Sequence, residues 1–177
     1  MTKLLALCGS LRKASLNAML LCAARRIAPE GIEIEIYPSL GKLPLFNPDI
    51  EDTNPPPVVD LRDSIIRADG LIIASPEYAH GISGVMKNAL DWMVSNESFV
   101  NKPVMLLNAS PRATLAQQAL QETLETMSAR VSYAAYAAVP ILGSKLDEDG
   151  IVNDFSISTM LLNRLAIFIQ EIHAAKP

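Results

Sequence analysis

The sequence predicts an α/β fold in which a parallel sheet is covered by helices on both faces. Short β-branched or aliphatic runs alternate with amphipathic helical segments, and no internal repeat interrupts this order. The chain has 177 residues, of which 50% are hydrophobic and 19% are charged, and this composition suits one folded domain over residues 1–177. Right-handed crossovers would place every strand's carboxyl end at one edge of the sheet, where ligands bind in such folds.

Five apolar runs of strand length support the predicted sheet. They are Leu4–Cys8, Ile32–Ile36, Leu71–Ala74, Val104–Asn108 and a weaker segment, Val131–Val139. Helical spacing of apolar residues between and after them predicts the covering helices. The stripes are Leu16 to Ile27; Val58, Leu61 and Ile65; Ile82 to Val94; Leu120, Leu124 and Met127; and Leu161, Leu165, Phe168 and Ile172. Met86, Met93 and Trp92 are expected in a core or subunit interface.

Net charge indicates the class of partner, and the cysteines and the absence of long apolar runs indicate the cellular compartment. The net charge is -4 with interspersed signs, which predicts neither a nucleic-acid surface nor a membrane surface and favours small molecules. Cys8 and Cys22 fall in a predicted strand and on the first helix, so reduced thiols and no disulfide are expected. The chain shows no signal sequence or run of membrane-spanning length, and a cytoplasmic protein is expected.

Two long connections separate predicted elements. The segment Tyr37–Pro57 is proline-rich and too long for a simple connector, so it is expected to line the ligand or a subunit contact. Gly143–Asp154 contains the acidic run Asp147-Glu148-Asp149 followed by Gly150. A solvated turn is the preferred interpretation of this acidic loop, and no metal site is expected.

The loop after the first strand has the features of an anion site. It leads into a helix whose first N–H groups and positive dipole end point at the loop, with Leu16 opening the helix. Ser10, Arg12, Ser15 and Asn17 add side-chain donors there. The alternative is a helix that Ser15 caps without any ligand. The loop has neither a Walker ending nor three dinucleotide-type glycines, so a mononucleotide is the better candidate.

A second loop follows the third strand and is expected beside the first. Pro76 fixes its chain, Gly81 and Gly84 permit close backbone approach, and Tyr78 offers a flat face with a polar tip. An aromatic heterocycle joined to a phosphate would bridge the two loops, which indicates flavin mononucleotide (FMN). Glu77 and His80 form a possible acid–base pair, but loop structure explains them at least as well.

Three motifs in register resemble the NADPH-dependent FMN reductase family, whose members include flavodoxin-like quinone, chromate and azo-dye reductases. The motifs are Gly9–Asn17, Ser75–Tyr78 and Lys87–Trp92, joined by Leu43–Asn47 in the long connection. The resemblance implies a flavodoxin-like three-layer sandwich with a five-stranded parallel sheet in the order 2-1-3-4-5. It further implies that Ser10, Arg12, Ser15 and Asn17 hold the FMN phosphate and that Pro76, Glu77 and Tyr78 contact the ring, partly through backbone groups. Relatives form dimers or tetramers, so a homodimer or homotetramer is expected.

The loop after the fourth strand departs from the family pattern. Many relatives carry glycines there, whereas residues 108–115 of this chain contain none. Ser110 and backbone N–H groups remain available to a flavin. Arg112 either faces the flavin or the phosphate of NADPH, or is a surface charge near a helix N-terminus.

The predicted activity is hydride transfer from NAD(P)H through bound FMN to a flavin, quinone or similar acceptor. No catalytic side chain is expected, because the cofactor carries the reactive chemistry. The resemblance favours NADPH, although no residue distinguishes it from NADH. The rival interpretation is a flavodoxin-like electron carrier or flavin-binding regulatory module without turnover. A phospho-receiver domain is excluded, because the first strand ends in Cys8-Gly9-Ser10 and not in clustered aspartates.

Overall fold

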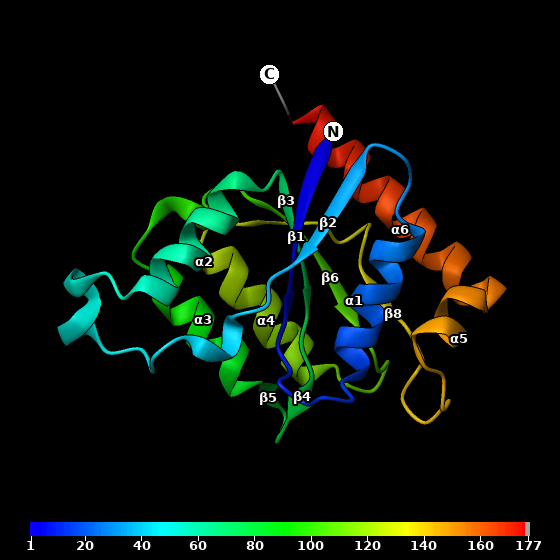
Figure 1. The fold of residues 1–177 in the computed structure, drawn as a ribbon, viewed down its shortest axis with the longest axis horizontal. Helices are drawn as coiled ribbons and strands as arrows, with labels where there is room; N and C mark the ends of the chain where they lie inside the picture. The colour runs from blue at the N-terminus through cyan, green and yellow to red at the C-terminus, as the bar shows by residue number, and fades with distance from the viewer. Residues whose placement is uncertain (176–177) are drawn as a thin grey trace.

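A parallel sheet divides the computed structural model, which describes residues 1–175, into two helical layers (Figure 1). Its strands are β1 (Thr2–Cys8), β2 (Ile32–Ile36), β3 (Gly70–Ala74), β6 (Pro103–Asn108) and β7 (Arg130–Val131), in the order β2-β1-β3-β6-β7. The predicted order 2-1-3-4-5 is therefore confirmed. The fifth position differs from the prediction, because Val131–Val139 is not one strand. A turn in which Ala135 N donates to Ser132 Oγ separates β7 from β8 (Ala137–Ala138), and both pair with β6.

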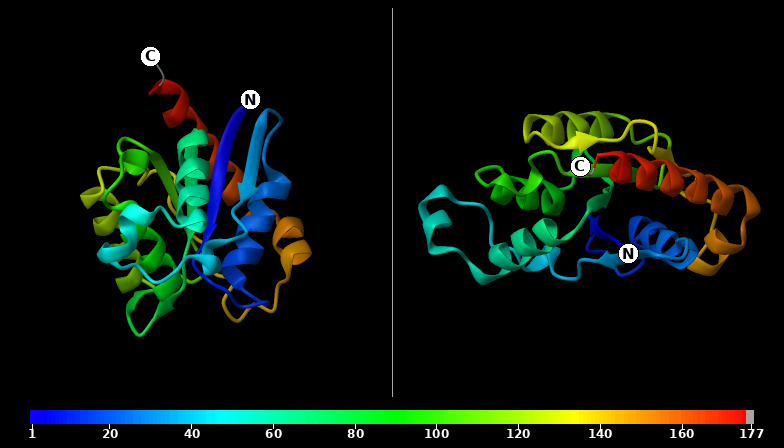
Figure 2. Two further views of the ribbon diagram at one scale, coloured as in Figure 1. Left: turned by 60° about the vertical axis from the view of Figure 1, so that its left-hand side comes forward. Right: turned by 90° about the horizontal axis from the view of Figure 1, so that it is seen from above.

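The alternation of side chains along β1 explains the two layers. Leu4 and Ala6 face one core with α1 (Leu16–Ile27), α5 (Glu148–Asn153) and α6 (Phe155–Ala174). Leu5 and Leu7 face a second core with α2 (Pro56–Arg67), α3 (Gly84–Met93) and α4 (Leu115–Thr126). The view from above in Figure 2 shows these helices on opposite sides of the sheet. The sandwich predicted from the sequence is thus the observed architecture.

The third helix starts later than its apolar stripe predicts. Ile82 belongs to β5 (Gly81–Ile82), which pairs with β4 (Glu77–Tyr78) in a separate hairpin. Ser83 then caps α3, since its hydroxyl accepts a hydrogen bond from Met86 N at 3.3 Å. Further along α3, Met86, Met93 and Trp92 are buried in the core, as predicted.

The acidic segment near the C-terminus is more ordered than a solvated turn. Asp147 Oδ1 accepts from Gly150 N at 2.8 Å and caps α5, and the fully buried Ile151 anchors this helix in the core. Glu148 and Asp149 pair with Arg26 of α1. The sequence prediction missed α5 because only one of its side chains is buried.

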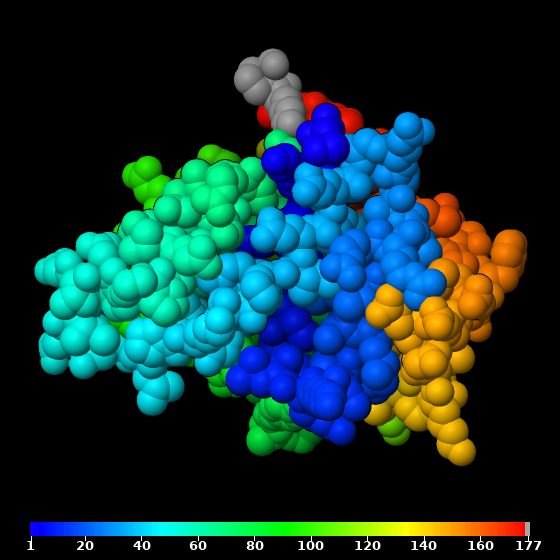
Figure 3. Space-filling view, viewed as in Figure 1, coloured from blue at the N-terminus to red at the C-terminus, as the bar shows by residue number. Residues whose placement is uncertain are grey.

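The long connection contains the short helices η1 (Leu40–Lys42) and η2 (Pro48–Thr53) and projects at the left of the space-filling view (Figure 3). Its middle is fixed to α3. Pro44 O accepts hydrogen bonds from Asn88 Nδ2 at 2.9 Å and from Trp92 Nε1 at 2.8 Å, and Phe46 N donates to Asn88 Oδ1 at 2.8 Å. Asn88 and Trp92 of the Lys87–Trp92 motif therefore hold this connection in place. A third short helix, η3 (Glu97–Phe99), follows α3.

Both cysteines are free thiols, in agreement with the prediction. A search of the described residues finds no helix with the length and apolarity needed to cross a membrane.

Candidate functional site

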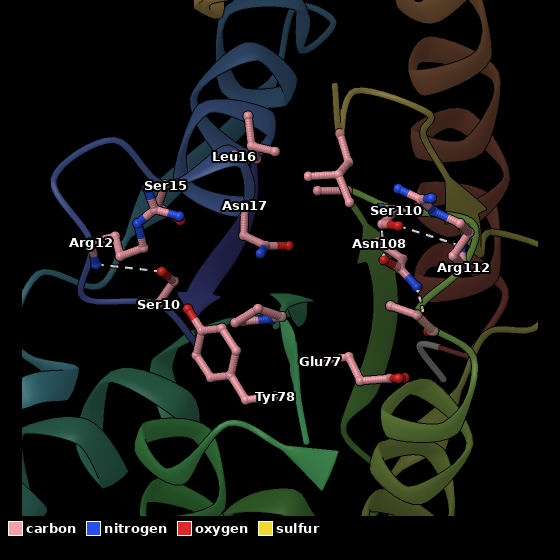
Figure 4. Close-up of a pocket in the computed structure, with 14 residues that line it drawn as sticks. Ser10, Arg12, Ser15, Leu16, Asn17, Glu77, Tyr78, Asn108, Ser110 and Arg112 are labelled. Atoms are coloured by element: carbon pink, nitrogen blue, oxygen red, sulfur yellow. Dashed lines mark hydrogen bonds between the residues drawn. The ribbon is translucent and has the colours of Figure 1, made fainter. Parts of the chain in front are cut away.

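A cleft of about 380 Å³ opens at the carboxyl edge of the sheet, where the loops after β1, β3 and β6 meet (Figure 4). The predicted site residues that line it are Ser10, Arg12, Ser15, Leu16, Asn17, Pro76, Glu77, Tyr78, Ser110 and Arg112. Gly81 does not line it. A Cβ added at Gly81 would meet only Tyr78 O, at 3.7 Å, so this glycine is not a point of close approach. The cleft also includes four residues outside the predicted set: Asn108, Ala109, Ala113 and Leu142.

The first wall of the cleft is the loop between β1 and α1. Gly9 N donates to Ala74 O at 2.8 Å, and a Cβ at Gly9 would lie 2.4 Å from Ser75 Oγ, so the approach of the two loops requires glycine. Ser15 caps α1 by accepting from Ala18 N at 3.2 Å. Because the first-turn N–H groups of a helix lack intrahelical acceptors, those of Leu16 and Asn17 are left for a ligand.

Asn17 has a feature that helix capping by Ser15 does not explain. Its side chain is buried, and its Oδ1 has no hydrogen-bond partner among the described residues. In Figure 4 this amide extends into the cleft, away from Arg12 and Ser10. A buried unpaired polar atom costs free energy, and a bound polar ligand removes that cost. The side-chain amide can present either Oδ1 or Nδ2 after rotation.

The second wall is the hairpin β4–β5. Its two-residue turn places Ala79 at φ 50° and His80 at φ 61°, a left-handed conformation that matches the twist of tight hairpins but is unfavourable for residues other than glycine. Ser75 Oγ donates to Ser83 Oγ at 3.2 Å at the base of the hairpin. Tyr78 is about half exposed and presents its ring at the cleft (Figure 4).

Glu77 and His80, the possible acid–base pair, do contact each other. Glu77 Oε1 lies 3.1 Å from His80 Nδ1, and Glu77 Oε2 accepts from Ala116 N at 2.9 Å. The hydrogen bond from Ala116 and the imidazole of His80 lower the pKa of the Glu77 carboxyl. Both carboxylate oxygens of Glu77 therefore have partners within the protein.

The third wall is the glycine-free loop after β6, and the buried Asn108 organises it. Asn108 Nδ2 donates to Ala113 O at 2.9 Å, and Asn108 Oδ1 accepts from Ser110 N at 2.9 Å. Arg112 N donates to Ser110 Oγ at 3.4 Å. A polar residue at the end of a buried strand was the available signal for Asn108, whereas nothing local marked Ala109, Ala113 or Leu142.

Cys8 lies beneath the first wall. Its Sγ is 3.5 Å from Ser10 O and 4.0 Å from Ser15 Oγ, and burial raises the pKa of the thiol. Among the described residues no group of His, Cys, Asp and Glu side chains has the arrangement of a metal site.

Comparison with known proteins identifies the family. Residues 2–141 match the sequence profile described as NADPH-dependent FMN reductase. The chain belongs to this family. It is 31% identical over 178 residues to a quinone reductase of Escherichia coli strain K12, which covers 96% of this chain and 95% of the relative. It is also 38% identical over 128 residues to the NAD(P)H-dependent FMN reductase of Pseudomonas aeruginosa, which covers 69% of each chain.

Solved structures agree with this assignment. FerB, a flavoenzyme NAD(P)H:(acceptor) oxidoreductase from Paracoccus denitrificans, superposes with a TM-score of 0.87 at 28% identity over 98% of both chains. Flavodoxin 1 from Bacillus cereus shares the fold, with a TM-score of 0.62 and 16% identity over 96% of this chain and 98% of its own. As a member of the reductase family, this protein is an FMN-dependent NAD(P)H oxidoreductase.

Proposed function

We propose that the cleft binds FMN across its three walls and that the protein passes hydride from NAD(P)H to a quinone or a similar small acceptor. The observation that carries this proposal is the convergence of all three loops on one cleft, whose lining includes Asn17, a buried residue with no hydrogen-bond partner for its Oδ1 among the described residues. The quinone reductase from Escherichia coli supports the acceptor class, because it matches nearly the full chain.

In this proposal the first wall binds the phosphate. Arg12, the hydroxyl of Ser10 and the free N–H groups of Leu16 and Asn17 supply donors to an anion. Charge-assisted hydrogen bonds contribute roughly 1.5–3 kcal/mol each, against roughly 0.3–1 kcal/mol from a helix dipole. The side chains would therefore dominate phosphate affinity. Ser15 contributes by holding the first turn of α1 in place.

The second and third walls would hold the ring. Pro76 and Tyr78 offer apolar and aromatic surface on one side, and Ala109 and Leu142 offer apolar surface on the other. FMN, when bound, supplies the hydride-accepting and electron-donating chemistry. The protein positions the ring, limits water around it through these apolar side chains, and leaves access for a second planar molecule.

Arg112 would bind the phosphate groups of the nucleotide donor. It lies across the cleft from Arg12, and its exposed guanidinium suits bidentate phosphate contacts (Figure 4). Because Ser110 and Asn108 fix the backbone on either side of Pro111, Arg112 extends from a defined position.

The proposal includes a homodimer or homotetramer in the cytoplasm. Light scattering of the purified protein determines its mass, and cell fractionation determines its location. A monomer, or a protein recovered outside the cytoplasm, would contradict these parts of the proposal without affecting the cleft chemistry.

Anaerobic titration tests the activity. The visible absorption of the FMN-loaded protein should bleach on addition of NADPH or NADH and return on addition of a quinone, with one equivalent of each. Flavin that no pyridine nucleotide bleaches would indicate the rival function, an electron carrier or regulatory module without its own turnover.

A further inference from the structure

Glu77 connects two walls of the cleft that are far apart in sequence. Its side chain belongs to the hairpin that carries Tyr78, and its Oε2 accepts from Ala116 N, 39 residues later, at 2.9 Å. Ala116 lies in the first turn of α4, directly after the loop with Ser110 and Arg112. We infer that Glu77 is a positioning residue that sets the spacing of the walls around the flavin ring, and this inference rests on the proposed function.

The start of α4 shows why the contact matters. Thr114 occupies the capping position, but its side chain makes no capping hydrogen bond, and its backbone is already helical at φ -92° and ψ -34°. The first-turn N–H groups of α4 therefore need another acceptor. The Glu77 carboxylate provides it and places negative charge at the positive end of the helix dipole. Its side chain is only 15% exposed, so water is a poor substitute.

The other carboxylate oxygen holds the hairpin turn. Glu77 Oε1 pairs with His80 Nδ1 at 3.1 Å, and His80 is one of the two turn residues with positive φ. Because His80 is 78% exposed, this pair is expected to contribute less than the contact with Ala116. Glu77 thus joins the strained turn to α4 through one carboxylate.

The placement predicts a specific binding defect. Loss of the Glu77 carboxylate removes the hydrogen bond that joins the hairpin to α4, and both of these elements belong to the walls proposed to hold the ring. Within residues 1–175 Glu77 forms no hydrogen bond to the proposed phosphate loop between β1 and α1. Binding of FMN and binding of riboflavin should therefore weaken by the same factor, because both ligands carry the ring.

The test measures flavin dissociation constants and amide exchange on the full-length apo-protein. Glu77→Ala should weaken FMN and riboflavin equally, by about tenfold, the effect of losing one charge-assisted hydrogen bond. It should also speed hydrogen exchange at the Ala116 amide. Glu77→Gln keeps an acceptor for Ala116 and should stay within about fivefold of wild type in affinity. The matched control is Glu122→Ala, which removes an exposed glutamate of α4, the helix that contains Ala116. It should change neither the flavin affinities nor the exchange rate at the Ala116 amide.

Three outcomes would overturn the inference: wild-type affinities in Glu77→Ala, unchanged exchange at Ala116, or a Glu77→Gln defect as large as that of Glu77→Ala. Failure of wild type to bind any flavin would instead overturn the proposed function. In that case the hydrogen-exchange rate at the Ala116 amide would still show whether Glu77 connects the hairpin to α4. Measurement of the binding-competent fraction separates a true affinity change from partial unfolding.

Discussion

Arg12 and Arg112 occupy equivalent positions on opposite walls of the cleft. The backbone N–H of each donates to the hydroxyl of a serine two residues earlier, Ser10 or Ser110, at 3.4 Å in both cases. Each serine follows a strand of the central sheet, β1 or β6. The two guanidinium groups therefore flank one cleft from separate loops (Figure 4), which allows each to bind a different anionic group.

Arg12→Ala is expected to weaken FMN binding by about 1.5–3 kcal/mol, the range for a hydrogen bond to a charged group. Fluorescence titration of the apo-protein measures this change. Because Arg12 is exposed, the melting temperature of the apo-protein should stay near that of wild type. A large drop in melting temperature with unchanged affinity would make Arg12 a structural residue. Lys13→Ala, an exposed neighbour outside the cleft, is the control.

Arg112→Ala is expected to raise the apparent Michaelis constant for NAD(P)H while FMN occupancy stays near wild type. The physical reason is loss of the guanidinium that pairs with donor phosphate. Steady-state kinetics on the FMN-loaded variant, combined with its flavin-to-protein ratio, gives both quantities. Loss of flavin with normal donor kinetics in the remaining holo-protein would place Arg112 in the FMN site.

Glu77→Gln and His80→Ala are each expected to leave the rate of flavin reduction by NAD(P)H within about tenfold of wild type. A positioned general acid or base contributes about 10²–10⁴-fold, and neither residue has that role in this account. Stopped-flow absorption follows the bleaching step directly. A loss of several hundredfold with FMN still bound would reveal a catalytic group in the hairpin.

The lowered pKa of the Glu77 carboxyl predicts that the stability of the fold depends on pH. Its pKa lies below the ordinary value of 4.5, chiefly because Ala116 N donates to it. The ionised form therefore stabilises the fold above pH 4.5, and this contribution disappears as the pH falls through the lowered pKa. Thermal melts of His80→Ala and of His80→Ala with Glu77→Gln should differ at neutral pH and converge in acid. A difference that does not change with pH would contradict this assignment.

The sequence was sufficient to predict the elements and the three loops that line the cleft, and the resemblance to the family implied the sheet order. Short aliphatic runs such as Leu4 to Leu7 and helical stripes of apolar residues identify the elements, and parallel connections place the strand ends together. The donor cluster from Ser10 to Asn17 was visible because its members are close in the chain.

Contacts between distant segments were not predictable in the same way. The hydrogen bond from Ala116 to Glu77 spans 39 residues, and no local pattern marks it. The division of the fifth strand depends on a turn at Ser132 between two pairs of strand residues, which are too short to give a periodic signal. Helix α5 has one buried apolar residue, so its capping by Asp147 was its only sequence signal.

The most direct test of the account compares the affinities of the apo-protein for FMN and riboflavin. The two ligands differ by the phosphate that the loop from Ser10 to Asn17 is proposed to bind. FMN is expected to bind at least about tenfold more tightly, and Arg12→Ala should reduce that preference. Equal affinity of wild type for FMN and riboflavin would contradict the assignment of this loop as the phosphate site.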